Sequence, residues 1–133
     1  MKAKHIMLID DTEEDLYVLN YILTKHNIAK KISIKNSAMD ALQYLNLRQT
    51  NPREFPDVIF LDIRMPAMDG FDFLEEFIKF PQAVKKKCDI IILTSSNNQD
   101  DIDRASKYPV VKKYLTKPLE QNTLLELSML QNL

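Results

Sequence analysis

Five short apolar runs alternate along the chain with longer segments in which apolar residues recur every three or four positions. The runs occupy residues 5–9, 31–36, 58–61, 90–93 and 110–115, and runs of this kind are typical of strands. Those at 58–61 and 90–93 are continuously apolar, which predicts strands buried on both faces of a sheet. The run at 31–36 is apolar only at alternate residues, so we expect a strand nearer the edge, with one side exposed.

The segments between the runs have the spacing of amphipathic helices. Thr12-x-x-Asp15 and Ser37-x-x-Asp40 resemble capping boxes, so helices should begin near residue 12 and again after residue 37. We expect Asn51-Pro52 to end the second of these helices. Three further helices are predicted, with inward residues Phe71, Leu74, Phe77 and Ile78 in the first, Ile102 and Ala105 in the second (residues 99–108), and Leu124, Leu127 and Leu130 in the last.

Strands that alternate with helices predict an α/β fold, here (βα)5, with a parallel sheet covered on both faces and right-handed crossovers. The 133 residues are enough for one domain and its core. The composition, with 45% hydrophobic and 28% charged residues, is that of an ordinary soluble protein. Periodicity alone does not give the order of the strands.

Composition also narrows the classes of function. The net charge of −1 gives no reason to expect nucleic acid or an anionic membrane as a main partner. The apolar segment near the N-terminus is too short for a signal peptide or a membrane span, so we expect a cytoplasmic protein. Gly70 is the only glycine, which excludes P-loop and G-x-G-x-x-G phosphate sites. The lysines beside Cys88 could lower the pKa of its thiol, but a lone cysteine without a motif is more often a structural residue.

Chemically active side chains follow four of the five predicted strands. The residues after strands one, three, four and five are Asp10-Asp11, Asp62, Thr94 and Lys117. Because the carboxyl ends of parallel strands lie along one edge of a sheet, these groups should converge in one crevice. Clustered carboxylates need a cation, and their hard oxygen atoms suit Mg²⁺. With a lysine and a hydroxyl beside them, the acids suit transfer of a phosphoryl group onto a carboxylate.

These motifs resemble the receiver domain of two-component response regulators, and the resemblance covers essentially all of residues 1–133. The matching features are Asp10-Asp11, Asp62 with Met65-Pro66 and Asp69-Gly70 behind it, Thr94, and Lys117-Pro118. The resemblance implies a flavodoxin-like, doubly wound sheet with strand order 2-1-3-4-5. It also implies that a histidine kinase or a phosphotransfer protein phosphorylates Asp62.

The same resemblance implies a role for each residue of the metal site. Asp11 and Asp62 would bind Mg²⁺ directly, together with the main-chain carbonyl of Arg64, and Asp10 would act through water. The side chain of Arg64 and Ser96 flank the route of an attacking water, and these positions tune the lifetime of the phosphoryl group in the family. Arg64 could pair with an aspartate or with the phosphate, or shield it.

For the switch, the resemblance implies that Lys117 contacts the phosphoryl group and that its bond to Pro118 is cis. Thr94 would bond a phosphoryl oxygen and move on activation, and Tyr114 would change rotamer with it, as a two-state element biased by local charge does. Gly70 is expected to need a positive φ, the conformation that glycine adopts readily.

The chain ends after its fifth predicted helix, so we expect no output domain, and the run T-S-S-N-N-Q-D-D-I is similar to stand-alone receivers that pair with phytochrome-type or other sensor kinases. A downstream protein would bind the face formed by helix 99–108, strand 110–115 and the last helix, where Lys112, Lys113 and Tyr114 lie. The apolar surface of the last helix could reflect dimerisation or plain packing.

Three alternatives remain open. The protein could be an intermediate of a phosphorelay, or an inert receiver-like interaction module, although such modules usually lack one of the acids or the lysine. The enzyme alternative is a metal-dependent phosphatase with an aspartyl nucleophile. That class expects its nucleophile as the first acid of a D-x-D pair after strand one, whereas Asp10 and Asp11 are adjacent and Asp62-Ile63-Arg64 lacks the second acid.

Overall fold

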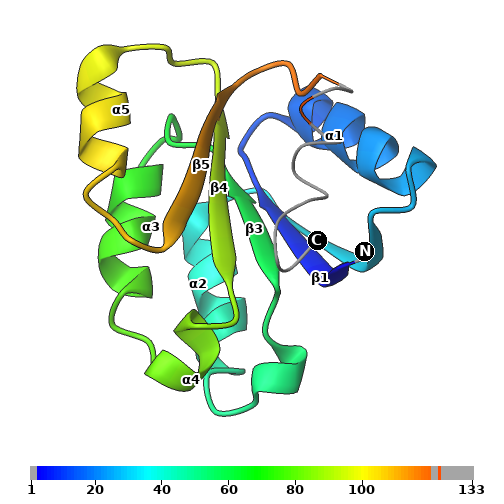
Figure 1. The fold of residues 1–133 in the computed structure, drawn as a ribbon, viewed down its shortest axis with the longest axis vertical. Coiled ribbons are helices and arrows are strands. Elements are labelled where there is room, and N and C mark those ends of the chain that lie inside the picture. The colour runs from blue at the N-terminus through cyan, green and yellow to red at the C-terminus, as the bar shows by residue number, and fades with distance from the viewer. Residues whose placement is uncertain (1–2, 121–122, 124–133) are drawn as a thin grey trace.

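The structure is a computed structural model that describes residues 3–120 and residue 123, and it contains one five-stranded parallel sheet with helices on both faces (Figure 1). The strands are β1 (Ala3–Ile9), β2 (Ala29–Lys35), β3 (Val58–Leu61), β4 (Asp89–Thr94) and β5 (Val111–Thr116). The helices are α1 (Glu13–Lys25), α2 (Ala38–Asn46), α3 (Gly70–Phe77), α4 (Gln82–Lys85) and α5 (Gln99–Ala105), with a 3₁₀ turn at Pro52–Glu54.

The strand order is β2-β1-β3-β4-β5, and every neighbouring pair is parallel. This is the flavodoxin-like fold, so the predicted fold class is confirmed. No helix within residues 3–120 is long and apolar enough to cross a membrane. The last predicted helix, with Leu124, Leu127 and Leu130, lies outside the described residues.

Alternate residues of the central strands fill two separate cores. Val58 and Phe60 of β3 pack on the side of α1, together with Leu16, Leu19 and Leu23 of that helix. Ile59 and Leu61 pack on the opposite side, against residues of α2 and α3. Figure 1 shows α1 on one face of the sheet and α2, α3 and α5 on the other. Burial of β3 and β4 on both faces is therefore confirmed, and the edge position of β2 as well.

Two expectations about helix ends are wrong. The Thr12 side chain makes no capping hydrogen bond, although α1 does begin behind it. Asp15, the other half of the expected capping box, accepts a hydrogen bond from Lys117 instead, because a charged donor makes a stronger hydrogen bond than a main-chain N–H. Helix α2 ends at Asn46, before Asn51-Pro52 can stop it; Ser37 does cap its start, accepting the Asp40 N–H at 3.1 Å.

Gly70 does not have a positive φ, so that prediction is also wrong. It is the first residue of α3, where Asp69 and Asp72 form a complete capping box that the sequence reading missed. A Cβ on Gly70 would lie 2.6 Å from the Ile63 Cα and 2.7 Å from the main-chain oxygen of Asp62. Glycine is needed here because α3 packs directly against the backbone that carries Asp62.

Cys88 lies in the core, with 1% of its surface exposed. Burial raises the pKa of its thiol well above the usual value, and the neighbouring Lys87 opposes this only weakly. A buried, protonated thiol is unreactive, which supports the structural role predicted for this residue.

Candidate functional site

Three carboxylates meet at the carboxyl end of the sheet. Asp10 and Asp11 follow β1, Asp62 follows the neighbouring strand β3, and one oxygen of each lies within 4.8 Å of the other two. Asp10 and Asp62 are buried, whereas Asp11 is exposed to solvent. The convergence predicted from the strand ends is therefore present for these acids.

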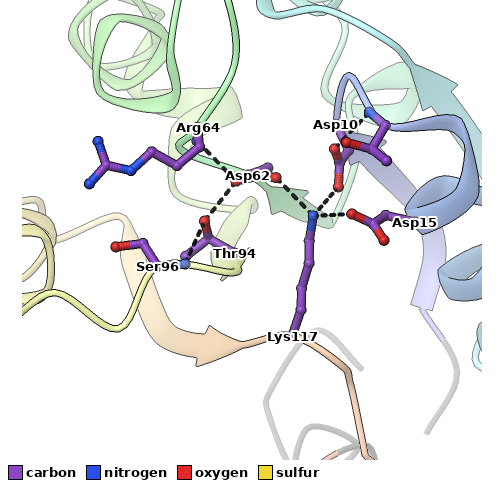
Figure 2. A network of polar contacts seen from close by, with 8 residues as sticks. Asp10, Asp15, Asp62, Arg64, Thr94, Ser96 and Lys117 are labelled. Atoms are coloured by element: carbon purple, nitrogen blue, oxygen red, sulfur yellow. Dashed lines mark hydrogen bonds and ion pairs between the residues drawn. The ribbon is translucent and has the colours of Figure 1, made fainter.

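Lys117 reaches this cluster from the end of β5. Its Nζ donates to Asp10 Oδ2 at 2.7 Å, to Asp15 Oδ2 at 2.7 Å and to Asp62 Oδ2 at 2.8 Å (Figure 2). Burial lowers the pKa of Lys117, but the three hydrogen bonds to carboxylates outweigh burial and raise the pKa above its ordinary value. The ammonium is thus charged at every physiological pH. The Lys117-Pro118 bond is cis, as the resemblance implied.

Asp62 is held through both of its oxygens. Oδ2 accepts from Lys117, while Oδ1 accepts from the Thr94 hydroxyl at 2.7 Å and from the main-chain N–H of Arg64 at 3.0 Å. Thr94 is fully buried at the end of β4. Three donors from three segments therefore fix one carboxylate at the carboxyl end of the sheet (Figure 2).

Tyr114 lies beside the β4–α5 loop. Its hydroxyl donates to the main-chain oxygen of Ser96 at 2.9 Å, and the Ser96 N–H lies 3.4 Å from Thr94 Oγ1. Burial raises the pKa of Tyr114, so the hydroxyl keeps the proton that it donates. The hydroxyl of Thr94 and the ring of Tyr114 are thereby connected through one residue of this loop.

The donor set fits a hard divalent cation. Three carboxylates within reach of one another offer the oxygen ligands that Mg²⁺ prefers. Burial raises the pKa of Asp10, whereas hydrogen bonds from Lys117 and from the Thr12 N–H lower it and limit the rise. Lys117 brings one positive charge to three aspartates, and Asp11 adds a fourth carboxylate beside them, so net negative charge remains that a cation would neutralise.

Comparison with known proteins agrees with this geometry. Residues 6–128 match the family model described as "Response regulator receiver domain". This chain belongs to the response regulator receiver family. Among its relatives, the two-component response regulator ORR13 of rice (Oryza sativa subsp. japonica) is 30% identical over 120 residues, which cover 90% of this chain and 91% of that one. The response regulator Rcp1 of Synechocystis is 31% identical over 117 residues, 86% of this chain and 76% of Rcp1.

Solved structures support the same assignment. A two-component response regulator from Cytophaga hutchinsonii superposes with a TM-score of 0.86 at 28% identity, covering 96% of this receiver and 95% of that chain. The manganese-bound form of response regulator Rcp1 superposes with a TM-score of 0.73 at 25% identity, covering 94% of this receiver and 88% of that chain.

Two residues of this receiver's site were not anticipated. Asp15 is a partner of Lys117, and its only signal in the sequence was a spacing that reads equally well as a helix cap. Asp101, in the first turn of α5, pairs with the side chain of Arg64 and accepts a hydrogen bond from Ser96 Oγ at 2.6 Å. Sequence reasoning allowed Arg64 an aspartate partner but could not identify it, because the packing of α5 against the β3–α3 loop is a tertiary contact.

Proposed function

We propose that this receiver accepts a phosphoryl group on Asp62 from a histidine kinase or a phosphotransfer protein, and that phosphorylation switches a protein-binding surface. The observation that carries the proposal is the carboxylate of Asp62, which is fixed by Lys117 and Thr94 and has two further acids beside it. We extend the receiver domain to the whole of residues 1–133.

In the transfer step, one oxygen of Asp62 attacks phosphorus while the bond from phosphorus to the donor's histidine nitrogen breaks. Asp62 thereby becomes an acyl phosphate. Lys117, already charged and within 2.8 Å of the carboxylate, stabilises negative charge on the phosphoryl oxygens. A bound Mg²⁺ would neutralise the remaining charge. Asp10, Asp11, Asp62 and the main-chain carbonyl of Arg64 would hold it, and the manganese-bound form of the relative Rcp1 supports a divalent cation here.

The switch would run from Thr94 to Tyr114. When the acceptor carries a phosphoryl group, the Thr94 hydroxyl bonds one of the phosphoryl oxygens, and the β4–α5 loop moves with it. Tyr114 responds because its hydroxyl is bound to that loop at Ser96. A local change of charge would thus select between two arrangements of one loop and one aromatic ring.

The surface that would transmit the signal consists of α5, β5 and the last predicted helix, which lies outside the described residues. Lys112 and Lys113 are exposed on β5, and none of the exposed large apolar side chains of the described residues lies on α5 or β5. A downstream protein that binds these two elements would therefore use charge more than apolar contact. Homodimerisation through this face, or passage of the phosphoryl group to a phosphotransfer protein, are variants of the same proposal.

Labelling by a small donor tests the function. The protein is incubated with acetyl phosphate and Mg²⁺, and intact mass is measured before and after treatment with base. The proposal expects one acid-stable, base-labile phosphoryl group on the wild type and none on Asp62→Asn, with labelling abolished by EDTA. If neither acetyl phosphate nor a kinase labels the wild type, the protein is an inert interaction module. Multiple turnover of phosphate esters would instead indicate the phosphatase.

A further inference from the structure

The guanidinium of Arg64 is held by a carboxylate that belongs to another element. Asp101, in the first turn of α5, forms an ion pair with Arg64, and the same Oδ2 accepts a hydrogen bond from Ser96 Oγ at 2.6 Å. The Asp101 side chain is 14% exposed and that of Arg64 is 56% exposed. Ser96 therefore positions the carboxylate, and the carboxylate positions the more exposed arginine.

Arg64 is thus held by two different partners, one bound to its main-chain N–H and the other to its guanidinium. Its main-chain N–H donates to Asp62 Oδ1 at 3.0 Å, which fixes the start of the residue beside the acceptor. Its side chain runs away from Asp62, and Figure 2 shows the guanidinium on the far side of the residue from the acceptor carboxylate. Without Asp101, nothing else among the described residues forms an ion pair with this guanidinium.

A phosphoryl group on Asp62 would compete for the same guanidinium. It carries close to two negative charges and three acceptor oxygens, and the planar fork of arginine binds such a group through two parallel hydrogen bonds. Asp101 offers one charge, but its position is already fixed by Ser96. The Arg64 side chain therefore has two possible partners, one in α5 and one on the acceptor.

We propose that Asp101 holds Arg64 aside from the acceptor and thereby sets how long the phosphoryl group survives; the inference rests on the proposed phosphorylation of Asp62. In hydrolysis, a water oxygen attacks phosphorus opposite the bond to Asp62. That bond breaks, Asp62 leaves as a carboxylate, and the water's proton leaves with phosphate or to solvent. A guanidinium lying on the phosphoryl oxygens would cover this approach. By holding Arg64 aside, Asp101 keeps this approach open to water and so shortens the lifetime of the phosphoryl group.

The test measures the half-life of the acyl phosphate after the donor is removed, in the presence of Mg²⁺. Asp101→Asn frees Arg64, and the half-life should lengthen by about two- to fivefold, the range that a partly exposed ion pair can contribute. Asp100→Asn is the matched control, since it removes the same charge one residue away and the Asp100 side chain makes no hydrogen bond or ion pair with the described residues. It should leave the half-life unchanged.

A double variant separates positioning of Arg64 from a structural role of Asp101. Adding Asp101→Asn to Arg64→Ala should produce no further change in half-life, because the side chain that Asp101 positions is gone. The same lengthening in both backgrounds, or no lengthening in the single variant, would overturn the inference while leaving Asp62 as the acceptor. Absence of any label on the wild type would overturn the proposed function, and this inference with it.

Discussion

The ammonium of Lys117 forms ion pairs with three carboxylates at once. Asp10 and Asp62 belong to the acidic cluster, but Asp15 comes from α1, and 42% of its side chain is exposed. Asp15 therefore holds the lysine from outside the cluster. It restrains the ammonium while competing with the acceptor for it.

Replacing Asp15 tests this restraint. In metal-free buffer, Asp15→Asn should lower the free energy of unfolding by about 0.5–1 kcal/mol, the contribution of a solvent-screened ion pair. Urea unfolding measures the change. Glu14→Gln is the control, since Glu14 forms no ion pair within the described residues and lies in the same turn. Equal losses in the two variants would mean that only the charge of the first helical turn matters.

His5 is a second residue whose effect on stability can be measured. It lies near the start of β1, whereas the site lies at the end of that strand. Its ring is buried, and Nε2 lies 2.7 Å from Ser33 Oγ. Burial, assisted by nearby Lys31, lowers the pKa of His5 from 6.5 to about 4. Because the folded state binds this proton less tightly than the unfolded state does, stability is retained above pH 6.5 and lost as the pH falls toward 4.

The size of this loss can be isolated with His5→Gln. Between pH 7 and pH 5 the wild type should lose about 2 kcal/mol more unfolding free energy than the variant, by linkage to this one group. Urea titrations at the two pH values give the difference, in which the acid response of the carboxylates cancels. Parallel losses in both proteins would show that His5 titrates normally in the fold.

Strands were easier to predict than helix ends, and the reason is physical. The bounds of β3 were predicted correctly, because four consecutive apolar residues, closely bounded by Pro56 and Asp62, are too few for a buried helix and fit a buried strand. Helix boundaries depend on which hydrogen-bond partner a polar side chain has in the folded protein. Asp15 had a capping position and a lysine within reach, and the lysine is more than 100 positions away in sequence. The pattern of residues around Asp15 does not indicate such a contact.

Gly70 illustrates the same limit and gives a prediction for α3. As the only glycine of the chain, it was predicted to need a positive φ. The structure instead shows that glycine is needed because α3 approaches Ile63 closely. Gly70→Ala should therefore destabilise the protein by about 1–3 kcal/mol through overpacking. Thermal unfolding measures this.

Ala67→Gly is the informative comparison. Ala67 has a φ of 64° in the loop between Asp62 and α3, so it is the non-glycine residue of this loop that occupies the left-handed region. Glycine relieves that strain but costs chain entropy, so the change should stay within about 1 kcal/mol of wild type. A larger loss at Ala67 than at Gly70 would contradict the packing account.

Across the whole molecule, the parallel sheet brings together groups that are remote in sequence. Asp10 and Lys117 are 107 positions apart and make a direct ion pair. The convergence of the acids, Thr94 and Lys117 could be predicted from the strand ends alone, because every strand runs in one direction. The link from Arg64 to Asp101 could not, since it depends on which elements pack side by side. The strand order was not given by periodicity either, but the resemblance to the receiver family implied it, and the structure confirms it.

Chemical trapping of the acyl phosphate shows whether Asp62 is the residue that takes the phosphoryl group. After labelling with acetyl phosphate and Mg²⁺, borohydride reduces an aspartyl phosphate to homoserine, and peptide mass spectrometry locates the converted residue. Homoserine is expected at position 62 and at no other aspartate. Conversion at Asp10, Asp11 or Asp15 with Asp62 intact, or a stable phosphate on a hydroxyl residue, would contradict it.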